Sequence, residues 1–234
     1  MIPIRDDVRT KTFPFVNLAL VLANVWAFWR EVLLGPRLDK FLARWGLVPL
    51  RYAKAGALAK LGAKLYFGPF LASMFLHGGF LHILGNMWIL LIFGDAVEDR
   101  FGHLRYLAFY LLAGFAAGLT QIYFSWGSAL PTIGASGAIA GVMGAYFFLY
   151  PLARVTIMIP LIIFFPTFEA PAFLFLGLWL WSQISSGLSL AGAGEVGGVA
   201  WWAHVGGFAA GAALLALMAP RKERARAGRR ESRR

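Results

Sequence analysis

The stretch IGASGAIAGVMGAY, residues 133–146, delivers one serine, Ser136, to the start of an apolar segment rich in glycine and alanine. A helix with so many small residues has a nearly bare face, against which another backbone can pack closely in a membrane. A serine at the start of such a helix is a helix cap, a packing residue or a nucleophile. Which of these three roles Ser136 has depends on the side chains that the rest of the chain places beside it.

The composition indicates an integral membrane protein. Of the 234 residues, 59% are hydrophobic and only 14% are charged, and the mean hydropathy is +0.67. Soluble domains carry about a quarter charged residues. The chain contains no cysteine, which excludes a disulfide framework, a thiolate metal site and a cysteine nucleophile.

The net charge of +11 is concentrated at the C-terminal end, where eight of the 22 Lys and Arg residues follow Pro220. A basic tail directly after an apolar helix is typical of a cytoplasmic anchor on anionic lipid headgroups. Nucleic acid is the weaker alternative because no folded basic domain accompanies the tail. We therefore expect the lipid bilayer, and not nucleic acid, as the partner of this charge.

Six apolar segments are candidates for crossing a bilayer, whose hydrocarbon core needs about 20 helical residues. The segments are residues 13–34, 79–97, 104–124, 136–152, 170–186 and 200–219. They predict an all-α polytopic bundle of six transmembrane helices. Asn17 and Asn24 lie seven residues apart in the first segment, so both fall on one helix face and are expected to point into the bundle.

Two stretches differ from these spans. Residues 35–68 mix charged, aromatic, glycine and proline residues, and we expect this first loop to lie on the membrane surface. Residues 155–166 are apolar, β-branched and interrupted by proline. They are either an interfacial strand or a broken beginning of the fifth helix.

The simplest organisation is a single membrane domain, residues 13–219, between an N-terminal segment of residues 1–12 and a basic tail of residues 220–234. The first apolar run is longer than the roughly 7–15 apolar residues of a secretory signal, so we expect it to be retained. Lys and Arg in the N-terminal segment, the short loops and the tail predict that both termini are cytoplasmic, in a bacterial-type cytoplasmic membrane.

A few polar side chains lie in or beside the predicted spans, where they are costly unless they serve function or bond helices together. They are His77, His82, Asn86, Ser136 and His204. Because the even-numbered helices begin on the outer side, all five are expected at a similar depth toward that side. His82 and Asn86 are four residues apart and share one helix face.

Glycines recur on the fourth and sixth predicted helices. They are Gly137, Gly141 and Gly144 on the fourth and Gly207 and Gly211 on the sixth. If these faces pack on each other, Ser136 and His204 come within hydrogen-bond reach, as a serine–histidine nucleophile pair requires. The free N–H groups of the first helical turn, together with His82 and Asn86, could then hold an oxyanion. No acidic residue is placed by the sequence beside His204, so we infer a dyad.

These residues resemble the motifs of the rhomboid family of intramembrane serine proteases, in matching order along residues 13–219. The G-x-S-G motif of the family is matched by Gly134, Ala135, Ser136 and Gly137. Its second-helix pattern of two histidines and an asparagine is matched by His77, His82 and Asn86. Its sixth-helix motif A-H-x-x-G-x-x-x-G is matched by Ala203, His204, Gly207 and Gly211.

The resemblance implies a serine endopeptidase that cleaves transmembrane protein substrates and needs no cofactor. Ser136 would be the nucleophile, His204 the general base, and His82 and Asn86 the oxyanion donors, with His77 and the motif glycines in supporting roles. The sequence departs from some family members at Ala140, where an aromatic residue four positions after the serine stacks on the catalytic histidine. No feature of the sequence indicates the oligomeric state.

Other functions fit parts of this pattern. Ser136 alone is commonly a helix cap, and His204 alone could bond two helices. Ala140 leaves open a rhomboid-like pseudoprotease that binds transmembrane clients without cutting them. Three histidines could bind a metal, but the chain has no H-E-x-x-H motif. A transporter is the most distant alternative, since only the prolines near residues 160–171 hint at broken helices.

Overall fold

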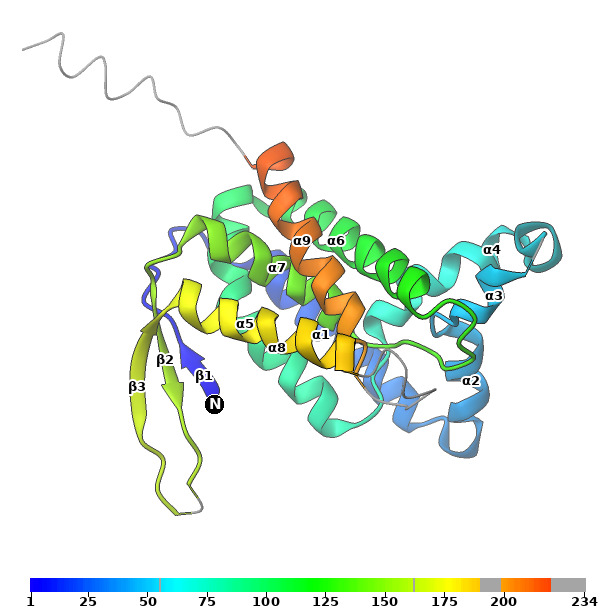
Figure 1. Cartoon of the computed structure of the whole chain (residues 1–234), viewed down its shortest axis with the longest axis horizontal. Helices are drawn as coiled ribbons and strands as arrows, with labels where there is room; N and C mark the ends of the chain where they lie inside the picture. The colour runs from blue at the N-terminus through cyan, green and yellow to red at the C-terminus, as the bar shows by residue number, and fades with distance from the viewer. Residues whose placement is uncertain (55, 162, 190–198, 220–234) are drawn as a thin grey trace, which may run out of the picture.

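The computed structural model describes residues 1–54, 56–161, 163–189 and 199–219. In this part of the chain a bundle of long helices carries a small sheet at one end and a group of short helices at the other (Figure 1). The predicted basic tail, residues 220–234, lies outside the described residues.

Five helices are long and apolar enough to cross a membrane. They are α1 (Phe15–Val32), α5 (Phe80–Phe101), α6 (His103–Phe124), α8 (Ala172–Ser189) and α9 (Trp201–Met218). The predicted class, a polytopic helical membrane protein, is therefore confirmed. The sixth predicted span corresponds to a shorter helix, α7 (Ser136–Leu149), so the count of six full spans stays a prediction.

Helix α7 is short and is surrounded by other helices. Residues 137–146 are all buried, and α7 contacts α5, α6, α8 and α9. Its 14 residues give a length of about 21 Å, less than the roughly 30 Å of a hydrocarbon core. Helix α7 is therefore too short to cross such a core by itself.

The contact between α7 and α9 is made by backbone atoms. A Cβ added at Gly207 would collide with the carbonyl oxygen of Gly137, and one added at Gly211 would collide with that of Gly141. An added Cβ at Gly144 would likewise meet the carbonyl oxygen of Phe208. Glycine is therefore required at these positions if the two helices are to approach this closely.

Three strands form a small antiparallel sheet in the order β1-β2-β3. The strands are β1 (Ile2–Arg5), β2 (Arg154–Met158) and β3 (Thr167–Pro171). Of the predicted stretch of residues 155–166, residues 155–158 therefore form a strand, and helix α8 begins only at Ala172. The sequence missed β1, which lies in the predicted polar N-terminal segment, because its pairing with β2 joins residues that are far apart in the chain.

The N-terminal segment is also attached to the end of α7. The Tyr146 hydroxyl donates a hydrogen bond to the Asp6 carboxylate, and the backbone N–H of Arg154 donates to Asp7 at 2.8 Å. Burial raises the pKa of the Asp6 carboxyl, and the hydrogen bond from Tyr146 opposes this shift. These contacts fix the end of α7 that is opposite Ser136.

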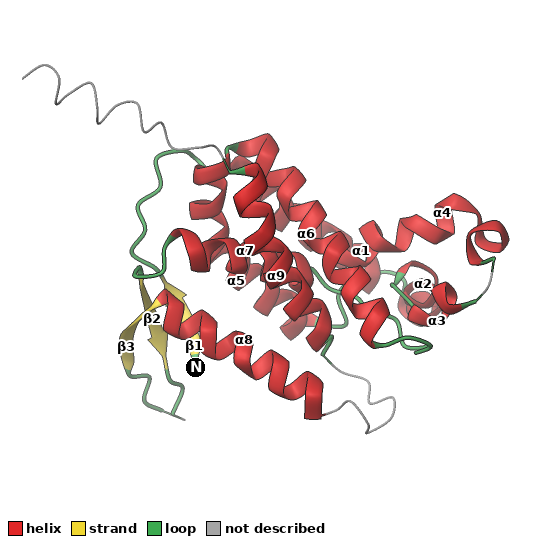
Figure 2. Ribbon diagram, turned by 45° about the horizontal axis from the view of Figure 1, so that its top comes forward, coloured by secondary structure: helices red, strands yellow, loops and turns green. Residues whose placement is uncertain are grey.

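The predicted first loop folds into short helices beside the bundle (Figure 2). They are η1 (Gly35–Arg37), α2 (Leu38–Trp45), α3 (Pro49–Ala53) and α4 (Ala57–Ala72). Helix α4 extends past the predicted end of the loop at residue 68 and is followed by η2 (Ser73–Phe75). That they lie on the membrane stays a prediction. The expected inward orientation of Asn17 and Asn24 on α1 is confirmed, because their exposed fractions are 1% and 0%.

The contact between α7 and α9 predicts that Gly211→Ala destabilises the protein by about 1 to 3 kcal/mol, since the new methyl group has no space. The matched control is Gly85→Ala on α5, where an added Cβ meets nothing within 4 Å. This control should be neutral or stabilising by up to about 1 kcal/mol. The stabilities of both variants are measured by unfolding the purified proteins in micelles with increasing dodecyl sulfate. Equal stability of the two variants would contradict a close backbone contact at Gly211.

Candidate active site

Ser136 and His204 meet where α7 and α9 begin. Ser136 is the first residue of α7 and His204 lies in the first turn of α9. The two side chains share a hydrogen bond of 2.8 Å between Ser136 Oγ and His204 Nε2. His204 is 8% exposed, and Ser136 is half-buried. The arrangement gives a serine hydroxyl a neighbouring base in a largely buried setting.

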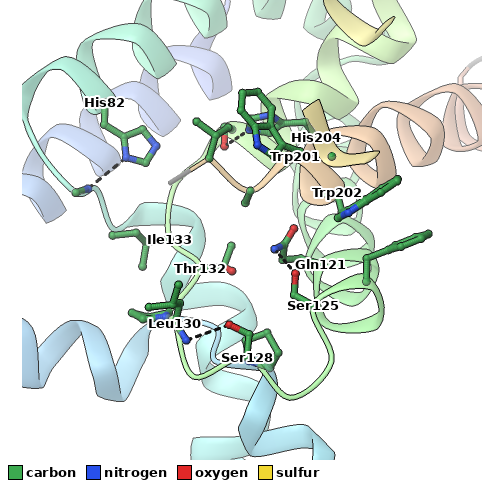
Figure 3. Close-up of a pocket in the computed structure, with 18 of the residues that line it drawn as sticks. His82, Gln121, Ser125, Ser128, Leu130, Thr132, Ile133, Trp201, Trp202 and His204 are labelled. Atoms are coloured by element: carbon green, nitrogen blue, oxygen red, sulfur yellow. Dashed lines mark hydrogen bonds between the residues drawn. The ribbon is translucent and has the colours of Figure 1, made fainter. Parts of the chain in front are cut away.

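Both residues line a cavity of about 1100 Å³. Figure 3 shows His82 on one side of this cavity and His204, Trp201 and Trp202 on the other. Among the described residues, no Asp, Glu, Lys or Arg side chain lines it. The described lining combines aromatic and aliphatic side chains with neutral polar ones.

His82 and Asn86 face the backbone just before Ser136. A Cβ added at Gly134 would lie 2.7 Å from His82 Nε2 and 3.6 Å from Asn86 Nδ2. The backbone N–H of Gly78 donates to His82 Nδ1 at 3.3 Å, so a neutral His82 ring carries its proton on Nε2. Gly134 has a φ of +123°, in a region that favours glycine. Two side-chain donors thus converge on one turn.

The Asn86 amide has no protein partner for its donor. Asn86 Nδ2 is buried and makes no hydrogen bond to the described residues. Buried donors are nearly always satisfied, so an unpaired one calls for an explanation. Asn86 also lines the cavity, and a ligand atom that accepts a hydrogen bond there would satisfy it.

His77 is separated from the cavity. It is 1% exposed and packs behind His82, with ring centroids 5.1 Å apart. Its backbone N–H donates to both carboxylate oxygens of Glu31, each at 3.2 Å. Glu31 lies in the last turn of α1 and is only 2% exposed. Glu31 and His77 therefore hold the segment that leads into α5.

Two glutamines that the sequence analysis did not single out also belong to the site. Gln183 on α8 accepts a hydrogen bond of 2.7 Å from His204 Nδ1. Gln121 on α6 accepts one of 3.0 Å from the backbone N–H of Ala203, the residue before His204. Both glutamines lie inside predicted spans, where burying an amide in the membrane costs free energy, as burying a histidine does. This cost is the feature of the sequence that could have identified them.

Comparison with known proteins then identifies the family. The family model of the Rhomboid domain matches residues 64–221. The chain belongs to the rhomboid family. The resemblance drawn from the three motifs is therefore confirmed.

Relatives of this rhomboid include proteins from plants, yeast and cattle. RHOMBOID-like protein 6, mitochondrial, of Arabidopsis thaliana is 35% identical over 124 residues, which cover 47% of this chain and 40% of that protein. Rhomboid protein 1, mitochondrial, of Saccharomyces cerevisiae is 28% identical over 142 residues, 58% of this chain and 38% of that protein. Presenilin-associated rhomboid-like protein, mitochondrial, of Bos taurus is 29% identical over 171 residues, which cover 71% of this chain and 38% of that protein. The chain spans about two fifths of the length of these relatives.

In this rhomboid, aromatic rings reach His204 from helices other than α7. Position 140, where some members of the family carry an aromatic residue, is a fully buried alanine. The ring of Trp179 on α8 lies 5.8 Å from that of His204 at an angle of 36°. Trp201 approaches edge-on, with ring centroids 6.4 Å apart. The imidazole is therefore packed between side chains of α8 and α9 despite Ala140.

The described residues contain no group of three or more His, Asp or Glu side chains that could hold a metal ion. His204 Nε2 is directed at Ser136, and His82 Nδ1 accepts a backbone N–H. The histidines of the site are thus arranged around a serine.

Proposed function

We propose that this rhomboid is an intramembrane serine endopeptidase. The observation that carries the proposal is the 2.8 Å hydrogen bond between Ser136 Oγ and His204 Nε2 beside a cavity with neutral lining. A serine is a weak nucleophile unless an adjacent base takes its proton. The family relationship supports the same chemistry.

In the proposed reaction, Ser136 Oγ attacks the carbonyl carbon of the scissile peptide bond while His204 Nε2 takes the hydroxyl proton. The protonated imidazole then gives that proton to the leaving amine, and an acyl-enzyme remains. Water, activated by the same histidine, hydrolyses the ester and frees Ser136. This chemistry uses protein groups and water alone.

The negative oxygen of the tetrahedral intermediate needs donors that are already in place. We assign this role to His82 Nε2–H, the Asn86 amide and the backbone N–H of Ser136. The unpaired Asn86 Nδ2 supports the assignment, as does the position of Ser136 at the start of α7, where N–H groups lack partners within the helix.

The proposed substrates are membrane-anchored proteins that are cut in or beside a transmembrane segment. The lining of the cavity supports this class, because it combines aromatic rings with neutral polar groups. A stable transmembrane helix hides its carbonyl groups in internal hydrogen bonds. Scissile segments are therefore expected to contain small or helix-breaking residues.

A fluorophosphonate probe tests the nucleophile. The detergent-purified protein should form a covalent adduct, because Ser136 displaces fluoride from phosphorus when His204 accepts its proton. Ser136→Ala and His204→Ala should not be labelled above background. The matched control is Ser189→Ala, which removes an exposed serine of α8 and should be labelled as fast as the natural protein.

The same experiment tests the oxyanion donors. Asn86→Ala should slow labelling by about 10²- to 10³-fold, the usual cost of losing one such donor. Equal labelling of the natural protein, Ser136→Ala and His204→Ala would contradict the proposal. Absence of labelling in all of them would favour a rhomboid-like pseudoprotease that binds transmembrane clients.

We also propose that both termini are cytoplasmic, in a bacterial-type cytoplasmic membrane. Arg5, Arg9 and Lys11 precede α1, and eight basic residues follow residue 220, a distribution typical of cytoplasmic segments. The relatives named above are mitochondrial by name. The kind of membrane is therefore part of this proposal, as the orientation is.

Single cysteines provide a test of the orientation because the chain has none of its own. In intact bacterial cells, a membrane-impermeant maleimide should label Arg37→Cys in η1 and should label Lys11→Cys only after the cells are broken. Both side chains are exposed, so access depends on the side of the membrane. The reverse pattern would overturn the orientation.

A further inference from the structure

Gln183 is a buried amide on a helix that otherwise buries little. Of the 18 residues of α8, the buried ones are Ala172, Leu176, Gln183 and Gly187, and Gln183 is 5% exposed. Its Oε1 lies 2.7 Å from His204 Nδ1, on the side of the imidazole opposite Ser136. A polar side chain that points into a membrane bundle is costly unless its hydrogen bonds are satisfied.

The partners of the Gln183 amide determine which of its ends faces His204. Gln183 Nε2 lies 3.2 Å from the carbonyl oxygen of Trp179 and 2.9 Å from the Ser182 hydroxyl. A carbonyl oxygen only accepts hydrogen bonds, so the NH₂ group of the amide must point toward Trp179. This leaves Oε1, which only accepts, to face the histidine.

The orientation of the amide in turn fixes the tautomer of His204. Since Gln183 Oε1 accepts, His204 Nδ1 must carry the proton that is donated to it. The lone pair of the neutral ring then lies on Nε2, directed at the Ser136 hydroxyl at 2.8 Å. This is the form of the imidazole that can remove a proton from serine.

We propose that Gln183 is a positioning residue that holds His204 in the tautomer and ring orientation that a general base requires. The inference rests on the proposed function and adds a third member to the Ser136–His204 pair. Gln183 touches neither substrate nor Ser136 and acts through His204. Because its amide is neutral, it orients the imidazole without supplying a charge to the imidazolium formed during reaction.

Side-chain ¹⁵N NMR of the histidine-labelled protein in liposomes tests the tautomer without any need for activity. The chain has four histidines, and the spectrum of His204→Ala identifies the His204 signals. In the natural protein, His204 should show a protonated Nδ1 and an unprotonated Nε2. In Gln183→Leu, which keeps similar bulk but cannot accept, it should show a mixture of both tautomers.

Kinetics on a single-span membrane substrate provide the second readout. Gln183→Leu should lower kcat by about 10- to 100-fold, the effect of leaving a buried donor unpaired, with little change in KM. Gln183→Glu restores an acceptor and should recover part of that loss. Its negative charge should also move the acidic limb of the pH–rate profile to higher pH, because it stabilises the protonated imidazole.

The groups around His204 other than Gln183 are unchanged in these variants. They are Ser136 on α7, Trp179 on α8, Trp201 on α9 and His82 on α5, which interacts with His204 electrostatically. The matched control is Ser186→Ala on α8, which should leave kcat, KM and the pH profile as in the natural protein.

An unchanged His204 tautomer in Gln183→Leu, or unchanged kcat and pH profiles in Gln183→Leu and Gln183→Glu, would overturn the role of Gln183. A purely structural role would lower the yield of folded protein while leaving the pH profile of Gln183→Glu in place, and that result would also overturn it. If the natural protein cleaved no substrate, the proposed function would fail, while the NMR measurement would still decide whether Gln183 sets the tautomer.

Discussion

The close contact between α7 and α9 is the constraint on which the rest of the structure depends. Because Gly207 and Gly211 of α9 have no side chains, they lie directly on the carbonyl groups of Gly137 and Gly141 of α7. Ser136 and His204 stand at the beginnings of these helices, and their 2.8 Å hydrogen bond requires this approach. A methyl group in the contact would separate the hydroxyl from the imidazole without touching either.

A chain of hydrogen bonds extends this contact to the neighbouring helix. It runs from the Trp179 carbonyl through the Gln183 amide to the His204 imidazole and the Ser136 hydroxyl. Inside a membrane protein a polar group without a partner is costly, so each member constrains the next. Asn86 lies outside this chain of hydrogen bonds, and its Nδ2 is one of four buried side-chain atoms without a partner among the described residues.

The features that could be predicted from the sequence are those that depend on residues close together in the chain. Apolar runs gave the long helices, and glycine spacing indicated which two helices could meet at Ser136. Strand β1 escaped prediction because its partner, β2, is distant in the chain. Gln183 and Glu31 escaped because a single polar residue in an apolar run does not say what it faces; that depends on helix rotation and packing. The enclosure of α7 by other helices depends on tertiary packing, which its own sequence does not reveal.

Proteolysis in a bilayer tests the account most directly. The purified protein is reconstituted in liposomes with a reporter whose single transmembrane segment contains small and helix-breaking residues, and the products are identified by mass spectrometry. We expect one cut in or beside that segment by the natural protein and an intact reporter with Ser136→Ala. A reporter that remains intact with the natural protein, or is cut equally by Ser136→Ala, would contradict it.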